Sequence, residues 1–218
     1  MISYILYKLY PGRGRTVRRF IRWIVFKLEG GQFYSKTLRK IMKDYHGVEI
    51  GMYTHGGCFE IHSFERETKI GRYCSIAVGA KGFTLDHPLE FKSTHGFFFN
   101  PACGYIKTFP VKPIPLEIGH DVWIGDGAKI LANVTSIGTG AVLGAGSVLS
   151  RNLPPYAVAV GHPARIVRYR FPVEVINELL ASKWWEKDIE EILPDIGEYT
   201  QNYLNESKTK SEPTYDCS

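Results

Sequence analysis

The chain of 218 residues lacks several features that would assign it to a common class of protein. Its four cysteines, Cys58, Cys74, Cys103 and Cys217, include no CxxC pair, so they predict free thiols rather than a disulfide scaffold or zinc site. No apolar run reaches the roughly 20 residues that cross a bilayer. No phosphate-binding loop of the P-loop type and no dinucleotide fingerprint is present. These absences exclude a transmembrane anchor and the usual nucleotide-binding folds.

Acidic residues are almost missing from the first part of the chain. Residues 1–43 hold 11 of the 27 basic residues but only one of the 22 acids, Glu29. The remainder of the chain is therefore mildly acidic. A basic end on an acidic body suggests contact with something anionic, such as a phospholipid headgroup, a nucleic acid or an acidic polysaccharide.

Residues 1–45 are predicted to be helical. Apolar residues recur at intervals of three or four, at Val17, Phe20, Ile21, Ile24, Val25 and Leu28, while arginines occupy the other faces. Pro11-Gly12 and Gly30-Gly31 interrupt the segment. It is either a helical cap on the main domain or an amphipathic helix on an anionic membrane. No nucleic-acid-binding motif accompanies the charge, so no nucleic-acid partner is expected. The opening run has no cleavage site, which predicts no signal peptide and a cytoplasmic protein.

A repeat of six residues dominates the middle of the chain. From residue 118 the sequence reads IGHDVW, IGDGAK, ILANVT and, after the extra Ser136, IGTGAV, LGAGSV and LSRNLP. Each repeat opens with an aliphatic residue, and in the first five a small or β-branched residue follows four positions later. Weaker copies occur at Ile50-Gly51 and at Ile70-Gly71 with Ile76. A period of six is incompatible with a helix face, where apolar positions recur every 3.6 residues. It predicts an all-β solenoid over residues 46–168, in which three short strands make one coil and the coils stack.

Three segments from residue 82 onward depart from the repeat. Residues 82–115 are far too long for a corner between strands, and loops of this length tend to be functional. We expect this insertion to pack as an arm against a neighbour. Residues 169–198 are expected to be helical, with Pro172 in the first turn of a helix. Residues 199–218 are expected to form a polar tail.

Together, the repeats, the insertion with DHPLEFKSTHGFF, the run PPYAVAVGHPARIVRYRF and the terminal LLASKWW resemble hexapeptide-repeat acetyltransferases. The most similar branch contains the xenobiotic (chloramphenicol and streptogramin) acetyltransferases and many surface-polysaccharide O-acetyltransferases. The resemblance covers residues 48–192 and leaves out the basic N-terminus. It implies a left-handed parallel β-helix, a homotrimer with active sites between subunits, and acetyl-coenzyme A as the acetyl donor, with no metal.

Acetyl transfer to a hydroxyl requires a base, because an alcohol is a poor nucleophile at neutral pH. A histidine is a suitable base in this pH range. The resemblance implies His87 as this base, because it lies six residues before the pair Ser93-Thr94. His95 is the alternative. Asp86 and Glu90 are candidates for orienting the imidazole.

The resemblance also implies a set of residues for coenzyme A. Small residues let the pantetheine arm lie close to the backbone, and arginines can pair with phosphates. The positions carried over are Trp123, Asp126, Ala145, Ser150, Arg151, Arg165 and Arg168.

The leading hypothesis is therefore an O-acetyltransferase that acts on a sugar hydroxyl of a surface polysaccharide. A xenobiotic acetyltransferase is the alternative within the family. Two other classes are possible: a γ-type carbonic anhydrase, although the paired histidine spacing that its zinc site needs is missing, and a non-catalytic trimeric scaffold.

Overall fold

The computed structural model describes residues 2–200, which form a stack of short strands with helices at both ends. The N-terminal helices are α1 (Ile2–Leu9), α2 (Arg15–Leu28) and α3 (Lys36–Ile41), and α3 continues into a π-helical turn (Met42–His46). The strands are β1 (Val48–Ile50), β2 (His55–Gly56), β3 (Thr68–Ile70), β4 (Ser75–Ile76), β5 (Lys81–Gly82), β6 (Leu116–Ile118), β7 (Trp123–Ile124), β8 (Lys129–Ile130), β9 (Ser136–Ile137), β10 (Val142–Leu143), β11 (Val148–Leu149), β12 (Ala157–Gly161) and β13 (Ala164–Tyr169). The C-terminal helices are α4 (Val173–Ser182), α5 (Ile189–Ile192) and α6 (Ile196–Thr200).

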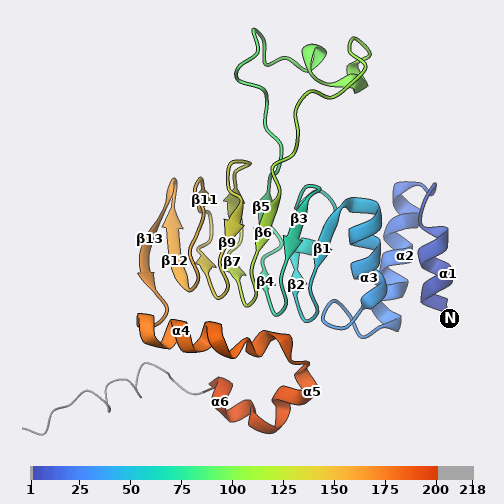
Figure 1. The fold of residues 1–218 in the computed structure, drawn as a ribbon. Coiled ribbons are helices and arrows are strands. Elements are labelled where there is room, and N and C mark those ends of the chain that lie inside the picture. Colours follow the sequence, from blue (N-terminus) through green and yellow to red (C-terminus); the bar gives the residue numbers. More distant parts are fainter. Residues whose placement is uncertain (1, 201–218) are drawn as a thin grey trace, which may run out of the picture.

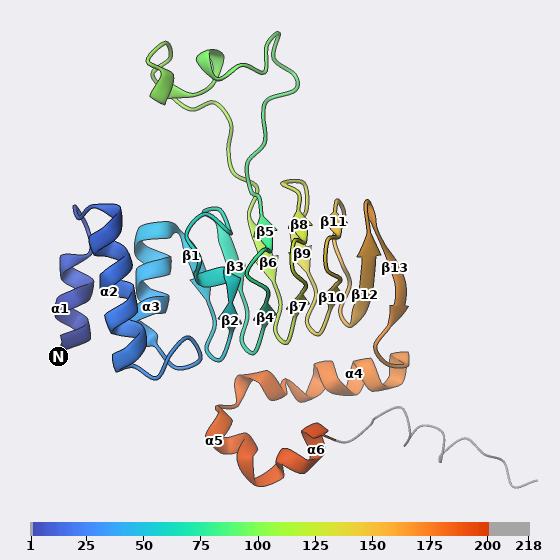
Figure 2. The ribbon, with the colours of Figure 1, turned by 180° about the vertical axis from the view of Figure 1, so that it is seen from behind.

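The strands belong to three sheets that the chain visits in turn (Figures 1 and 2). Sheet A contains β1, β3, β6 and β9, sheet B contains β2, β4, β7, β10, β12 and β13, and sheet C contains β5, β8 and β11. One pass through A, B and C is called a coil below. Neighbouring coils pair in parallel, and only the last pair, β12 with β13, is antiparallel. Parallel strands flanked by helices at both ends are thus confirmed.

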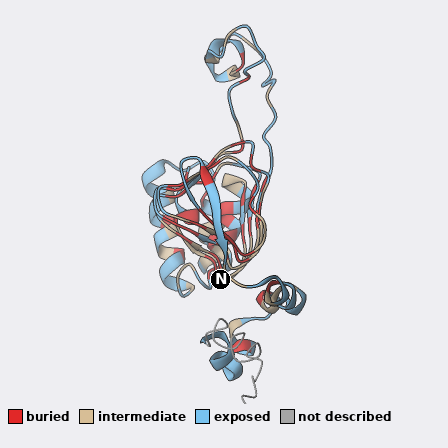
Figure 3. Cartoon of the chain, turned by 90° about the vertical axis from the view of Figure 1, so that its left-hand side faces the viewer, coloured by how far each residue is buried: buried red, intermediate tan, exposed pale blue. Residues whose placement is uncertain are grey.

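The register between coils aligns the aliphatic residues that open the repeats. In sheet A, Ile50 pairs with Ile70, which pairs with Ile118, which pairs with Ile137. All four are buried, and the equivalent columns of sheets B and C meet them inside the stack. Figure 3 shows that the buried residues are concentrated in the coils, while the arm and the outer helices are largely exposed. Each aliphatic residue therefore contributes roughly 1.5–3 kcal/mol of burial to the same core, which explains why an aliphatic residue recurs at this position despite the extra residues between repeats.

The second coil deviates from the repeat at Gly82, which pairs in register with Ile130. The position would normally carry an aliphatic residue. Here the ring of Phe64 fills the space instead, since a Cβ on Gly82 would lie 2.6 Å from the Phe64 Cδ1. The long insertion begins directly after this glycine.

A buried arginine joins the N-terminal helices to the first coil. Arg39 donates hydrogen bonds to the carbonyl oxygens of Gly51, Gln32, Ser35 and Thr54 at 2.7–3.0 Å. Its burial lowers the pKa of the guanidinium to about 10. The helices break at Pro11-Gly12 and Gly30-Gly31, as expected. Within the described residues, every helix is too short or too polar to cross a membrane.

The C-terminal helices lie along the corner between sheets A and B, on the other side of the stack from the insertion (Figures 1 and 2). Trp185, in a short 3₁₀ turn (Trp184–Glu186), stacks on His120 with ring centroids 5.3 Å apart. Tyr73 and Arg72 donate hydrogen bonds to the Lys187 carbonyl oxygen. The polar tail was expected to begin at residue 199, but α6 continues to Thr200. Residues 201–218 lie outside the described part.

Candidate active site

The insertion forms an arm that leaves the stack between β5 and β6, at the corner of sheets C and A (Figures 1 and 2). Its base is held by Glu65, whose carboxylate accepts hydrogen bonds from the backbone amides of Thr84 and Leu85. The Ile114 amide closes the base by donating to the Thr84 carbonyl oxygen at 2.7 Å. Among the described residues, the hydrogen bonds of residues 86–113 join the arm only to itself. The arm therefore projects from the stack as a separate, folded unit.

His87 lies in this arm with its imidazole held on two sides. Its Nδ1 is 2.8 Å from the Thr94 carbonyl oxygen, and its ring meets the buried Phe99 ring edge-on at 4.8 Å. A carbonyl oxygen can only accept, so the neutral imidazole carries its proton on Nδ1. The lone pair then lies on Nε2, on the side of the ring away from Thr94. The side chain is exposed, so Nε2 is available to take a proton from a bound molecule.

In the sequence, Ser93-Thr94 served only as a motif that marks His87. In the structure, the backbone of Thr94 contacts the His87 ring. A turn at Pro88, where the Phe91 amide donates to the Pro88 carbonyl oxygen, folds the chain back so that Thr94 reaches His87. The orienting group is thus a backbone carbonyl, which no pattern of side chains could reveal.

The two acids expected to orient His87 lie differently. The Asp86 Oδ1 accepts from the backbone amide of His87 at 3.1 Å, so it fixes the chain rather than the ring. Glu90 is exposed and, within the described residues, has no hydrogen bond to His87. A role for either acid beside the imidazole remains only an expectation.

His95, the alternative base, has the opposite arrangement. Its Nδ1 accepts a hydrogen bond from the Phe97 amide at 3.2 Å and caps a 3₁₀ turn (Gly96–Phe98). The proton of the neutral ring is therefore on Nε2, and the basic nitrogen is already occupied. His87 is the better placed of the two for proton removal.

Two further histidines, His120 and His55, have structural contacts. The Nδ1 of His120 accepts from the Arg72 amide, and burial lowers the pKa of this histidine. His55 lies against Ser75 and Phe33. In the described part of the chain, no three His, Cys, Asp or Glu side chains converge in a way that could hold a metal ion.

Two of the predicted donor-binding residues lie at the corner between sheets B and C. Asp126 and Ala145 occupy equivalent positions in adjacent coils, and the Gly146 amide donates to the Asp126 carbonyl oxygen at 2.7 Å. The Asp126 carboxylate accepts from the Gly79 amide at 2.8 Å, so it fastens the neighbouring corner. Ala145 is exposed and leaves the corner open.

The other predicted residues lie apart from this corner. Ser150 and Arg151 follow β11 at the corner of sheets C and A, the corner from which the arm departs. Arg165 and Arg168 project from the terminal strand β13, and both are exposed. Trp123 opens β7 on sheet B with 55% of its surface exposed. Together they lie on the outside of the coils.

Within the chain, the arm leaves the stack at the same corner as Ser150 and Arg151, whereas Asp126 and Ala145 lie at the corner between sheets B and C. The arm that contains His87 projects from the stack (Figure 1), while the predicted donor residues lie on the coils. A single described chain therefore presents a base and a small-residue edge at different places.

The comparisons with known proteins identify the chain as an acetyltransferase. It is 34% identical over 172 residues to a chloramphenicol acetyltransferase from Agrobacterium fabrum, a match of 70% of this chain and 81% of that protein. It is also 34% identical over 134 residues to a probable macrolide acetyltransferase from Lysinibacillus sphaericus, with 58% and 73% covered. A maltose O-acetyltransferase from Clostridium difficile 630 overlaps it in space with a TM-score of 0.44 and 20% identity, over 78% of this chain and 86% of that one.

No family model matches the chain. The sequence relatives nevertheless show the family, because each is more than 30% identical to the chain over more than two thirds of its own length. The chain belongs to the hexapeptide-repeat acetyltransferases, in the branch of the chloramphenicol and macrolide acetyltransferases.

Proposed function

We propose that the protein transfers an acetyl group from acetyl-coenzyme A to a hydroxyl group, with His87 as the general base. The observation that carries this proposal is the hydrogen bond from the His87 Nδ1 to the Thr94 carbonyl oxygen, which leaves Nε2 basic and exposed. Nε2 takes the hydroxyl proton as the oxygen attacks the acetyl carbon. The carbon–sulfur bond then breaks, and the proton passes from the imidazolium to the departing thiolate. Atoms and charge balance with no further reactant.

The donor is proposed to lie along the late coils. Ala145 offers an open corner for the pantetheine arm, and Arg151, Arg165 and Arg168 are exposed cations suited to phosphates. Ser150 and Trp123 complete the expected set. Asp126 is the least suited, because its carboxylate already binds the Gly79 amide.

We further propose that the coils wind left-handedly and that three chains assemble into a trimer. The separation of the arm from the corner of Ala145 supports this assembly, because the arm of one chain must reach the coils of a neighbour to complete a site. The enclosed site between subunits would also exclude water from the thioester. We also propose that the assembled protein acts in the cytoplasm.

For the acceptor, the relatives named as chloramphenicol and macrolide acetyltransferases favour a xenobiotic hydroxyl over the surface sugar that the sequence suggested first. A sugar hydroxyl is the second candidate. The basic N-terminal segment favours it, since such a segment suits an acceptor that carries phosphate.

An acceptor panel tests the proposal. The full chain would be incubated with acetyl-coenzyme A and, separately, with chloramphenicol, a macrolide and free sugars, and the release of thiol would be followed. We expect release that depends on chloramphenicol or the macrolide, with a mass gain of one acetyl group on the acceptor. Thiol release that no hydroxyl acceptor stimulates would overturn the proposal.

A further inference from the structure

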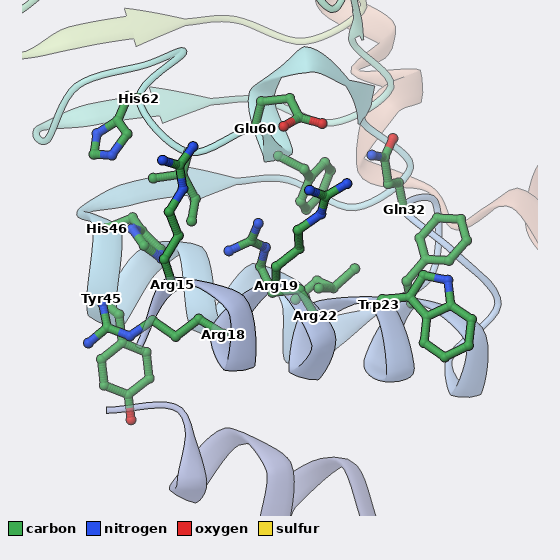
Figure 4. A pocket seen from close by; sticks show the side chains of 14 residues that line it. Arg15, Arg18, Arg19, Arg22, Trp23, Gln32, Tyr45, His46, Glu60 and His62 are labelled. Atoms are coloured by element: carbon green, nitrogen blue, oxygen red, sulfur yellow. The ribbon is translucent and has the colours of Figure 1, made fainter. Parts of the chain in front are cut away.

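A pocket of about 720 Å³ lies between α2 and the turn at residues 59–62 of the first coil (Figure 4). Four arginines from α2 line it: Arg15, Arg18, Arg19 and Arg22. Glu60 is the one carboxylate among the lining residues. In Figure 4, Arg15, Arg19 and Arg22 lie between the helix and the turn, and Arg18 extends toward Tyr45. The pocket therefore combines a defined cavity with a strong excess of positive charge.

The positive charge is left uncompensated by the protein. In the described part of the chain, none of the four arginines forms an ion pair, and the buried Nε of Arg18 has no hydrogen-bond partner. Burial, followed by the charges of Arg22 and Arg18, lowers the pKa of His46, which lines the same pocket, to about 4. Arg22 donates a hydrogen bond to the Tyr10 hydroxyl at 3.1 Å, and the Arg18 guanidinium lies over the Tyr10 ring. Neither contact supplies negative charge, and clustered cations without counter-ions cost stability. Such an arrangement is typical of a site for an anion.

We propose that this pocket binds a phosphate or diphosphate group, and that the source of the group is the headgroup of an anionic lipid. The planar guanidinium forms paired hydrogen bonds with phosphate oxygens, and several in one cavity match a multiply charged anion. A pocket suits a compact anion better than the extended backbone of a nucleic acid, which requires a basic stripe.

An aromatic pair next to the pocket supports the lipid source. Trp23 lines the pocket and stacks on Phe20 with ring centroids 5.8 Å apart. The two side chains are 54% and 57% exposed. Exposed aromatic rings beside cationic groups are favoured at the level of lipid headgroups, where the rings enter the apolar boundary and the cations bind phosphate. This binding site is independent of the proposed acetyl transfer.

The test compares two double variants of the full chain with the same change in charge. Arg15→Gln with Arg19→Gln removes two exposed arginines of the pocket. Arg13→Gln with Lys27→Gln removes two cations of the same segment that do not line it. Each protein would be titrated with inorganic diphosphate, and its retention on phosphatidylglycerol–phosphatidylcholine vesicles would be compared with that on phosphatidylcholine alone.

We expect the pocket variant to bind diphosphate at least about tenfold more weakly and to lose retention on the phosphatidylglycerol vesicles, while the control stays close to the unaltered protein. Diphosphate binding that needs Arg15 and Arg19, without retention on vesicles, would keep the phosphate site and overturn the lipid source. If the unaltered protein bound neither diphosphate nor the phosphatidylglycerol vesicles, or if both double variants lost the same amount of binding, the site itself would be overturned.

Discussion

The Nδ1 of His87 lies 2.8 Å from the carbonyl oxygen of Thr94, and this contact decides which nitrogen of the ring can act as a base. The bond comes from the backbone, so it survives substitution of the Thr94 side chain. It fixes the proton on Nδ1 and directs Nε2 outward. Most consequences of the proposed chemistry depend on that orientation.

Replacement of His87 is the first test of the base. His87→Ala should lower kcat/KM by about 10²–10⁴-fold, the range expected when a positioned general base is lost. His95→Ala is the matched control from the same arm, because its Nδ1 is already bonded to the Phe97 amide. A steady-state thiol-release assay measures both. A larger loss in the His95 variant would reverse the assignment of the two histidines.

Phe99 is a positioning residue for the same ring. Phe99→Leu removes the aromatic edge contact at 4.8 Å while keeping an apolar side chain in the buried site. The imidazole should lose alignment, so kcat should fall about tenfold while KM for acetyl-coenzyme A stays near its original value. Parallel falls in kcat and in thermal stability would instead indicate a purely structural role.

His46 predicts a dependence of stability on pH. Its pKa of about 4 in the folded protein lies below the ordinary value of 6.5, because burial and then the neighbouring arginines oppose its charge. As the pH falls, His46 therefore takes up a proton in the unfolded chain before it does so in the folded protein. The free energy of unfolding should fall as the pH drops from about 6.5 to about 4. His46→Gln keeps an acceptor for the Tyr10 hydroxyl, 2.8 Å away, but cannot titrate.

Urea unfolding at several pH values measures this contribution. The Gln variant should lose less stability than the unaltered protein across the same window. Identical slopes in the two proteins would show that His46 does not contribute to the loss.

Arg39 predicts a large structural effect far from the arm. Arg39→Met would leave four carbonyl oxygens without their donor, with a cost of about 3–5 kcal/mol in the free energy of unfolding. Lys36→Met, at an exposed position of the same helix, should change it by less than about 0.5 kcal/mol. Chemical unfolding monitored by circular dichroism would detect the difference, and equal values for the two variants would refute the anchoring role.

The regular coils could be predicted from the sequence because their cause is local. Ile118, Ile124 and Ile130 each open a repeat, and their spacing alone places them on three successive sheets. The coil around Gly82 could not be anticipated in the same way. Its core position is filled by the ring of Phe64, which lies 18 residues, or one coil, earlier and pairs with Gly82. The period aligns the two residues, but it does not show that the ring of one coil fills the core position of the next.

The candidate site was predictable to a lesser degree. His87 was found through its resemblance to a motif, but its partner is the backbone of Thr94, and a backbone acceptor leaves no trace in residue types. Asp126 could not be distinguished from a ligand contact until its bond to the Gly79 amide was seen. The arginine pocket was visible only as a charge excess, because its other wall, with Glu60, comes from a separate segment.

The most direct test of the account is complementation between two inactive variants. His87→Ala removes the base, and Ala145→Trp fills the open corner proposed for the donor. Each would be produced alone and also together with the other under different affinity tags, so that mixed assemblies can be purified. If the arm of one chain serves the coils of another, a mixed assembly contains a site with both His87 and Ala145 intact. We predict that acetyl transfer, absent from either variant alone, reappears in the mixed assemblies. Mixed assemblies as inactive as the separate variants would contradict a site shared between chains.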